Sequence, residues 1–151
     1  MPGAVTIVPG QGLADRINAV VPDSIEETTA EWVRVRLEDL VDVSRFLHDD
    51  RELDGRYLSS ISGVDRYECF EVVYHITSLS HQHQLVVKVR ADHEEPNVPS
   101  VVSVWQGANL QEREVYDLLG VRFSGHPSLK RILLWEGFPG HPLRKDCQNG
   151  T

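Results

Sequence analysis

ECFEVVYHIT, residues 68–77, and LVVKVR, residues 85–90, are the two stretches of sequence that decide the fold. Large apolar residues occupy every second position from Phe70 to Ile76 in the first stretch, and from Leu85 to Val89 in the second. This period of two is typical of strands that bury one face. We therefore expect a long antiparallel hairpin, with the polar residues 78–83 as its loop.

Upstream of this hairpin the sequence predicts two amphipathic helices. Apolar residues recur at helical spacing over residues 11–21, where Pro22 closes the segment, and again over residues 38–48. The second helix carries Glu38 and Asp39 in its first turn, where negative charge favours the helix dipole. Alternating or β-branched residues predict three further strands, at Ser24–Thr28, Trp32–Leu37 and Tyr57–Ile61.

Downstream of the hairpin the chain is expected to leave the sheet. The acidic segment Ala91–Pro99 contains two prolines, so we expect a loop there. Ser100 is then placed to cap a short helix over Ser100–Gln106.

A further helix is predicted to begin near Asn109 and to end at Leu119. Glu112 lies three residues after Asn109, which resembles a capping box, and Gly120 suits the position after a helix C-terminus. Beyond Val121–Phe123 the chain becomes irregular and rich in glycine and proline.

These elements predict one α+β domain over residues 1–151, with amphipathic helices packed on a mixed or antiparallel sheet. Its core is expected over residues 11–108, and a helix followed by an extended docking arm over residues 109–151. A chain of 151 residues is long enough to bury such a core without metals or disulfides.

Composition excludes several classes of protein. No run approaches the roughly 18 apolar residues of a membrane span, and the N-terminus lacks a signal peptide. We therefore expect a cytoplasmic or membrane-peripheral protein. Cys69 and Cys147 are expected to be free thiols, and two cysteines are too few for an iron–sulfur cluster, which usually needs about four thiolates.

The formal net charge of −8 is unevenly distributed. Residues 112–146 carry +1, so the remainder of the chain carries −9. An acidic body argues against nucleic acid as a partner, since phosphate binding needs a basic face.

The C-terminal stretch LQEREVYDLLGVRFSGHPSLKRILLWEGFPGHPLRKD, residues 110–146, is unusually dense in charge. On a helix Arg113 can pair with Asp117, but surface pairs contribute only about 0.3–0.5 kcal/mol each. Such density therefore favours a protein partner or a buried ion-pair network. His126 and His141 each precede a proline, which predicts extended turns from which the neighbouring basic residues project.

This stretch closely resembles the signature of the 30 kDa subunit, also called the C subunit, of NADH:quinone oxidoreductase (respiratory complex I). The resemblance extends more weakly upstream and covers roughly residues 30–146. The matching segments include Glu112-Arg113-Glu114, Tyr116-Asp117, Gly120, Gly125-His126-Pro127, Arg131-Ile132-Leu133 and Gly140-His141-Pro142-Leu143-Arg144-Lys145-Asp146.

The resemblance implies a hydrophilic subunit of the peripheral arm, on the cytoplasmic side of the cell membrane. Its expected neighbours are the quinone-site D subunit and cluster-bearing subunits, and it would meet the membrane only through the complex. FMN and the iron–sulfur clusters lie on partner subunits, so no cofactor and no catalytic residue are expected here. The residues expected to form signature and interface are Glu112, Arg113, Glu114, Tyr116, Asp117, Gly120, His126, Pro127, Arg131, His141, Pro142, Arg144, Lys145 and Asp146.

Three other hypotheses remain open at this point. One is a related subunit of a membrane-bound hydrogenase or of a dehydrogenase with another donor. A second is a free-standing enzyme that uses Glu112, Glu114 and His126 as acid–base groups. A third is a metal site; imidazoles suit zinc or copper, but no third ligand is spaced to complete a site, and we favour a solvated hairpin tip. The histidines concerned are His75, His81, His83 and His93.

Overall fold

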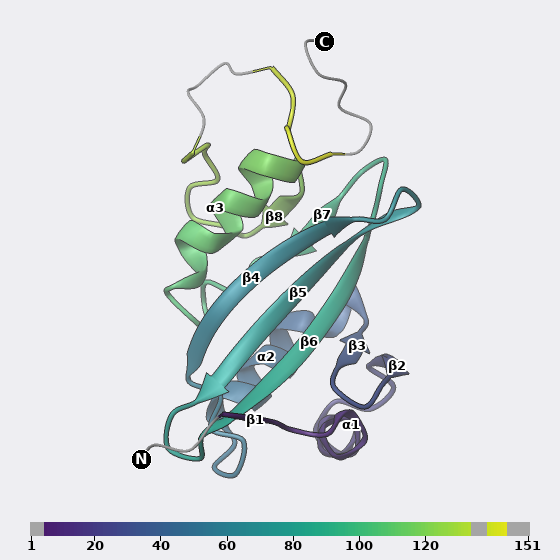
Figure 1. Cartoon of the computed structure of the whole chain (residues 1–151), viewed down its shortest axis with the longest axis vertical. Helices are drawn as coiled ribbons and strands as arrows, with labels where there is room; N and C mark the ends of the chain where they lie inside the picture. Colours follow the sequence, from purple (N-terminus) through teal and green to yellow (C-terminus); the bar gives the residue numbers. More distant parts are fainter. Residues whose placement is uncertain (1–4, 134–138, 145–151) are drawn as a thin grey trace.

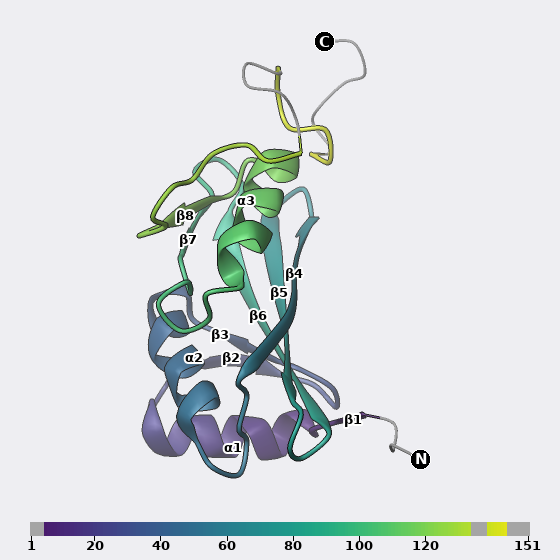
Figure 2. The same cartoon turned by 90° about the vertical axis from the view of Figure 1, so that its left-hand side faces the viewer.

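A computed structural model describes residues 5–133 and 139–144 of the chain. It shows a mixed sheet with the helices on one face and the other face open, as Figures 1 and 2 show from two sides. The sheet order is β2 (Ile25–Thr28), β3 (Val33–Val35), β6 (His83–Asp92), β5 (Cys69–Ser78) and β4 (Tyr57–Asp65), with β1 (Thr6–Ile7) parallel to β6. The helices are α1 (Gly10–Val20), α2 (Leu40–Asp49) after the 3-10 turn η1 (Leu37–Asp39), and α3 (Ala108–Leu119).

The predicted hairpin is confirmed as β5 and β6. The two strands pair antiparallel without a register shift, from Cys69 opposite Asp92 to Ser78 opposite His83. Phe70 and Tyr74 lie on the helix side of the sheet and are fully buried. Burial of each such aromatic side chain stabilises the fold by roughly 1.5–3 kcal/mol, which is why the alternation sets the register.

The three helices cover the buried face of this sheet. Helix α1 inserts Leu13 and Ile17 into the core, and α2 inserts Leu40 and Leu47. Helix α3 packs on β4, where Gly63 leaves room for Leu119. The predicted helices over residues 11–21 and 38–48 are confirmed within one or two residues, and so is the α+β fold with a mixed sheet.

The predicted helix at Ser100–Gln106 is wrong, because the segment forms only turns. It is rich in β-branched valines, which lower helix propensity. Its first residue is also committed elsewhere, since the Ser100 hydroxyl donates to Glu112. The capping box at Asn109 is wrong for the same reason: α3 begins at Ala108, and the Glu112 side chain turns into the core. Gly120 does end α3, with φ +80°.

The segment predicted as a loop at residues 91–99 is partly strand. β6 continues to Asp92, and β7 (Asn97–Pro99) pairs parallel with β8 (Arg122–Ser124) in a second, two-stranded sheet. Each of these strands has only three residues, and α3 separates them in the sequence. Such short strands leave no periodic signal, so a local sequence pattern does not predict them. The strand predicted at Tyr57–Ile61 is correct but too short, since β4 reaches Asp65.

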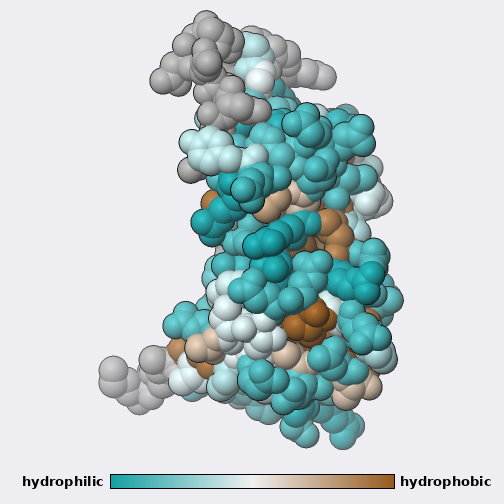
Figure 3. Space-filling model, turned by 90° about the vertical axis from the view of Figure 1, so that its right-hand side faces the viewer, coloured by the Kyte–Doolittle hydropathy of each residue, from teal (hydrophilic) through white to brown (hydrophobic). Residues whose placement is uncertain are grey.

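The open face of the sheet carries charged side chains that pair with one another. Glu71 on β5 accepts hydrogen bonds from Arg66 Nη2 and Lys88 Nζ, both at 3.3 Å, and the Lys88 ammonium lies 4.1 Å from the ring centroid of Trp32. Seen from the right-hand side of Figure 1, the surface is largely hydrophilic, with apolar residues in small separate patches (Figure 3).

Gly10 offers a test of how α1 is positioned. A Cβ atom on Gly10 would lie 1.9 Å from the Thr29 carbonyl oxygen and 2.9 Å from that of Trp32, both backbone atoms. We predict that Gly10→Ala destabilises the chain by about 1–3 kcal/mol in urea unfolding, because overpacking moves the backbone. Gly12→Ala is the matched control on the same helix: nothing lies within 4 Å, so it should stabilise by about 0.5–1 kcal/mol. Equal midpoints for the two variants would contradict the close packing.

Candidate functional site

The described C-terminal segment, which carries six of the fourteen predicted site residues, lies against α3. We call the described residues after β8, namely 125–133 and 139–144, the arm. They contain no helix or strand and run beside α3 (Figure 1). The residues at 134–138 and 145–151, including Trp135, Phe138, Lys145, Asp146 and Cys147, lie outside the described residues.

Asp117 is the first anchor of the arm. Its side chain is fully buried on α3 and pairs with Arg131, whose Nε donates to Oδ1. The second carboxylate oxygen accepts the backbone N–H groups of Ile132, at 3.1 Å, and Leu133, at 2.7 Å. A buried carboxylate is tolerated only when paired and hydrogen-bonded, and here the arm supplies every one of these donors.

The C-terminal end of α3 supplies backbone acceptors to the same segment. Arg131 Nη2 donates to the Asp117 carbonyl oxygen at 2.9 Å, and His141 Nδ1 lies 2.9 Å from that oxygen. Leu143 N–H donates to the Leu118 carbonyl at 2.8 Å. These bonds use carbonyl groups that have no partner within the helix. Two features favour glycine at position 120: its φ is positive, and a Cβ atom there would lie 2.8 Å from the His141 ring.

A second anchor holds the last described residue of the arm. The guanidinium of Arg144 lies 5.0 Å from the ring centroid of Phe70, and its Nη2 donates to the His93 carbonyl at 3.3 Å. The His93 ring stacks on Phe70 at a centroid distance of 4.5 Å, and its Nε2 lies 3.1 Å from Asp65 Oδ1. The arm is therefore held at α3 and again at the end of the β5–β6 hairpin.

His126 fixes the start of the arm. Its Nδ1 accepts the Ser128 N–H at 2.9 Å, so Nε2 carries the proton and donates to the Asn109 carbonyl at 3.0 Å. Both His126 and His141 lie in non-helical backbone, as the following prolines predict.

Much of the dense charge in residues 110–146 forms contacts within the chain. Arg131 and Arg144, expected to project from the arm, bind Asp117 and the hairpin instead. Arg113, expected to pair with Asp117 along the helix, donates to the carbonyl groups of Lys130 at 3.0 Å and Arg131 at 3.2 Å. Contact of these residues with another protein of the complex stays a prediction.

Glu112 is a second buried carboxyl group on α3. It is fully buried, and it accepts hydrogen bonds from Ser100 Oγ at 2.6 Å and from Val101 N–H at 2.8 Å. Burial raises the pKa of Glu112 to about 7, against the partial compensation of these two bonds. The same desolvation, with the Glu112 charge as a second cause, raises the pKa of the buried Tyr74 phenol well above its usual value.

The acid–base and metal hypotheses are not supported by this geometry. Glu112 is sealed in the core, Glu114 is exposed, and His126 is bonded to backbone, so the three share no cleft. His81 Nε2 lies 3.0 Å from the Arg51 carbonyl oxygen and His83 Nε2 lies 2.7 Å from that of Leu53, which gives both rings a structural role. Among residues 5–133 and 139–144, no three His, Cys, Asp or Glu side chains gather where they could hold a metal ion.

Sequence reasoning missed the partners of the anchors. The sequence singles out Phe70 by alternation, Ser100 as a helix cap and His93 as a candidate metal ligand, but nothing local to them indicates a contact with residues 144 or 112. Trp105 is buried and donates its indole N–H to the Gly55 carbonyl at 2.9 Å, which places it in the core.

Removal of the Asp117 charge should release the arm. We predict that Asp117→Asn accelerates amide hydrogen exchange at Ile132 and Leu133 by at least about tenfold, because breaking a buried ion pair costs roughly 3–5 kcal/mol. The exposed Glu114→Gln on the same helix is the control and should leave both amides unchanged. Unchanged exchange in Asp117→Asn would show that the arm is held without this carboxylate.

Glu112 should make the stability of the chain fall as pH rises from about 4.5 to about 7. The folded-state pKa, about 7, lies above the ordinary value of 4.5, so its contribution is fully present below pH 4.5 and is lost as pH rises to about 7. The loss is on the order of 3 kcal/mol. We predict that Glu112→Gln, compared with the unaltered chain by urea unfolding between pH 4.5 and 8, becomes relatively more stable by this amount. A difference independent of pH would contradict the assignment.

Comparison with known proteins agrees with the fold and with the signature. The family described as respiratory-chain NADH dehydrogenase, 30 Kd subunit, matches residues 33–151. A protein of Roseiflexus sp. (strain RS-1), named as the C subunit of NADH-quinone oxidoreductase, is 46% identical over 145 residues, covering 91% of this chain and 83% of that protein. The protein of the same name from Acidothermus cellulolyticus is 42% identical over 138 residues, covering 86% and 72%.

Two solved structures share the fold. A trypsin-resistant fragment of Nqo5 superposes with a TM-score of 0.62 at 30% identity, covering 79% of this chain and 98% of the fragment. A chain of an archaeal membrane-bound sulfane sulfur reductase superposes with a TM-score of 0.76 at 24% identity, covering 93% and 86%, which shows a common fold alone.

None of the helices in the described part of the chain has the length and apolarity needed to cross a membrane. The signature segment that builds both anchors of the arm falls within the matched region. This chain belongs to the 30 kDa subunit family of respiratory-chain NADH dehydrogenases.

Proposed function

We propose that this chain is a non-redox docking subunit of NADH:quinone oxidoreductase, placed in the peripheral arm beside the quinone-site D subunit. The assembled enzyme would pass electrons from NADH through FMN and iron–sulfur centres on other subunits to quinone, coupled to proton translocation. The names of the curated relatives support this assignment. The cytoplasmic side of the cell membrane is the corresponding location.

One observation carries the docking role: two arginines of the arm are bound within the chain, while two of its leucines face outward. Arg131 and Arg144 are bound within the chain, whereas Leu133 is 56% exposed and Leu143 is 57% exposed. Leu110, on the neighbouring helix, is 53% exposed. Exposed apolar residues on a backbone that the fold holds in place are typical of a surface that another protein covers.

The small number of cysteines fits a positional role. The sequence contains two cysteines, and an iron–sulfur cluster usually needs about four thiolates. Cys69 is half-buried on β5 and is a free thiol. We infer that the chain contributes to electron transfer by holding cluster-bearing and quinone-site neighbours in place.

The assignment is tested with a tagged copy of the chain, recovered from mildly solubilised native membranes, with the co-purifying proteins identified by mass spectrometry. Recovery of NADH-binding, cluster-bearing and quinone-site subunits is the expected result. Recovery of the chain alone would contradict a docking role. Recovery with subunits that bind a different electron donor would assign the chain to a hydrogenase-like or other-donor complex.

The arm surface is tested by a substitution that leaves its anchors intact. We predict that Leu143→Asp lowers recovery of the complex roughly tenfold, because a charge replaces an apolar contact worth about 1.4 kcal/mol or more, while the urea midpoint of the isolated chain is unchanged. Leu79→Asp is the matched control, since Leu79 is 74% exposed at the β5–β6 turn, far from the arm (Figure 1). Substitution of Arg131 would be less informative, because it would also release the arm.

A further inference from the structure

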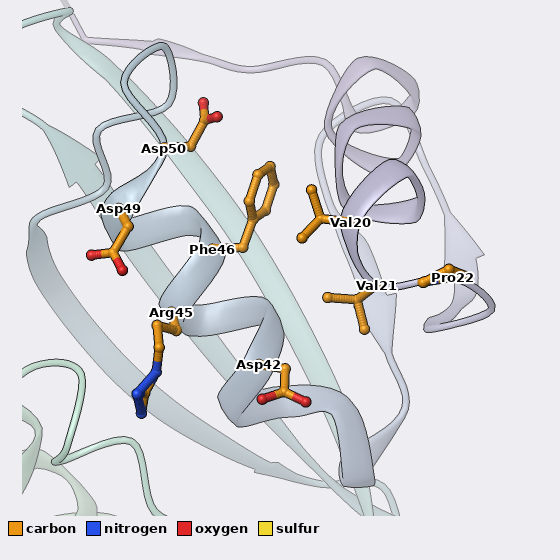
Figure 4. Close-up of a pocket in the computed structure, with 8 residues that line it drawn as sticks. All are labelled: Val20, Val21, Pro22, Asp42, Arg45, Phe46, Asp49 and Asp50. Carbon is orange, nitrogen blue, oxygen red and sulfur yellow. The ribbon is translucent and has the colours of Figure 1, made fainter.

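A second candidate contact surface lies at the other end of the molecule, between α1 and α2. A groove of about 560 Å³ opens there, which we call the α1–α2 groove. Its apolar floor is formed by Val20, Val21, Pro22 and Phe46. Figure 4 shows Val20 and Phe46 pointing toward one another across the space between the two helices.

Part of the apolar floor is exposed to solvent. Val20 is 56% exposed, Pro22 is exposed, and Val21 and Phe46 are half-buried. The arm lies at the opposite end of the sheet in both Figures 1 and 2, so it does not cover this groove. Apolar side chains contributed by two neighbouring helices form the kind of groove that binds an amphipathic segment.

Three of the four charged residues that line the groove are acidic, namely Asp42, Asp49 and Asp50, and the fourth is Arg45. Asp42 and Asp50 lie at the two ends of the floor, and Arg45 points away from α1 (Figure 4). Asp50 is bonded to Arg16 at 3.1 Å, whereas Asp42 is exposed and has no ion-pair or hydrogen-bond partner among the described residues.

The C-terminus of α1 adds a further negative potential beside Asp42. The helix ends at Val20, next to the groove, and no basic residue lies in its last turn. The carbonyl end of a helix carries roughly half a negative charge, which favours a cation placed within the last turn. An uncompensated helix terminus and an unpaired carboxylate at the same end of an apolar floor therefore favour a positively charged group there.

From this arrangement we propose that the α1–α2 groove binds a basic amphipathic segment of a partner subunit. An apolar side chain of that segment would lie between Val20 and Phe46, and a neighbouring lysine or arginine would reach Asp42 and the last carbonyl groups of α1. This inference rests on the proposed function, because it requires the chain to be assembled with other subunits. It assigns a second contact surface, separate from the arm.

The occupant is identified by photo-crosslinking in the assembled complex. A photoreactive amino acid replaces the exposed Val20 in the tagged full-length chain, and the complex is purified from membranes after illumination. The expected result is a crosslink to another subunit, at a peptide that contains both apolar and basic residues. A crosslink to a second copy of this chain or to lipid, or no crosslink in an intact complex, would overturn the proposal.

Charge substitution provides a second measurement. Asp42→Lys is expected to reduce recovery of the crosslinked subunit at least about fivefold, corresponding to roughly 1 kcal/mol, and more strongly at low salt than at high salt. Asp15→Lys, an exposed position elsewhere on α1, is the matched control and should have no effect. Equal recovery with both variants would overturn the role of Asp42.

The two proposals fail in distinguishable ways. If the unaltered chain recovers no other subunit, the proposed function fails. If it recovers the full set of subunits but neither the Val20 crosslink nor the Asp42 effect is seen, only the groove assignment fails. The urea midpoint of each variant, measured on the purified chain, separates loss of contact from loss of fold.

Discussion

Two carboxylates on α3 are buried and must be hydrogen-bonded. The positions of the arm and of the Ser100–Val101 turn depend on this constraint. Asp117 has its carboxylate at zero exposure, where an unpaired charge would cost several kcal/mol. Its donors come from the arm: the Arg131 guanidinium and two consecutive backbone N–H groups. Glu112, on the same helix, holds the Ser100–Val101 turn in the same way. A single helix therefore helps to fix two irregular segments through polar groups, in addition to the apolar packing of residues such as Val101 and Trp105.

The sequence predicts the elements that local apolar periodicity fixes, and it misses the segments that distant polar contacts fix. The β5–β6 hairpin and helices α1 and α2 are confirmed because burial on one face imposes a period that is visible locally. The Ser100–Gln106 helix was wrong because Ser100 bonds to a residue twelve positions away, and β7 was missed because its partner β8 lies beyond α3. At the site, the signature drew attention to Asp117, Arg131 and Arg144, whose place at an interface stays a prediction. Only the three-dimensional structure shows that their charges are directed at one another and at the hairpin.

The inward direction of these charges changes how a docking surface should be sought in this family. Density of Lys, Arg, Asp and Glu in the signature suggests an electrostatic interface, yet much of that charge is used to hold the arm. In the proposed docking role, the arm would present to a neighbour an ordered backbone with Leu133 and Leu143 on the outside. Pre-ordering matters because a segment that folds only on binding loses affinity to the entropy of its own ordering. An arm already held by Asp117 and Phe70 avoids most of that loss.

The positions of the two surfaces suggest what the sheet itself contributes. The arm lies at one end of the β5–β6 hairpin, where Arg144 stacks on Phe70, and the α1–α2 groove lies toward the other end (Figures 1 and 2). Each strand of the hairpin has ten residues, which at about 3.3 Å per residue corresponds to roughly 33 Å. A paired hairpin with one buried face resists bending, since bending it would break both its inter-strand hydrogen bonds and its core contacts. Two partners held at its ends would therefore be kept at a set separation, which is the property a non-redox subunit needs if its role is to position the electron carriers of others.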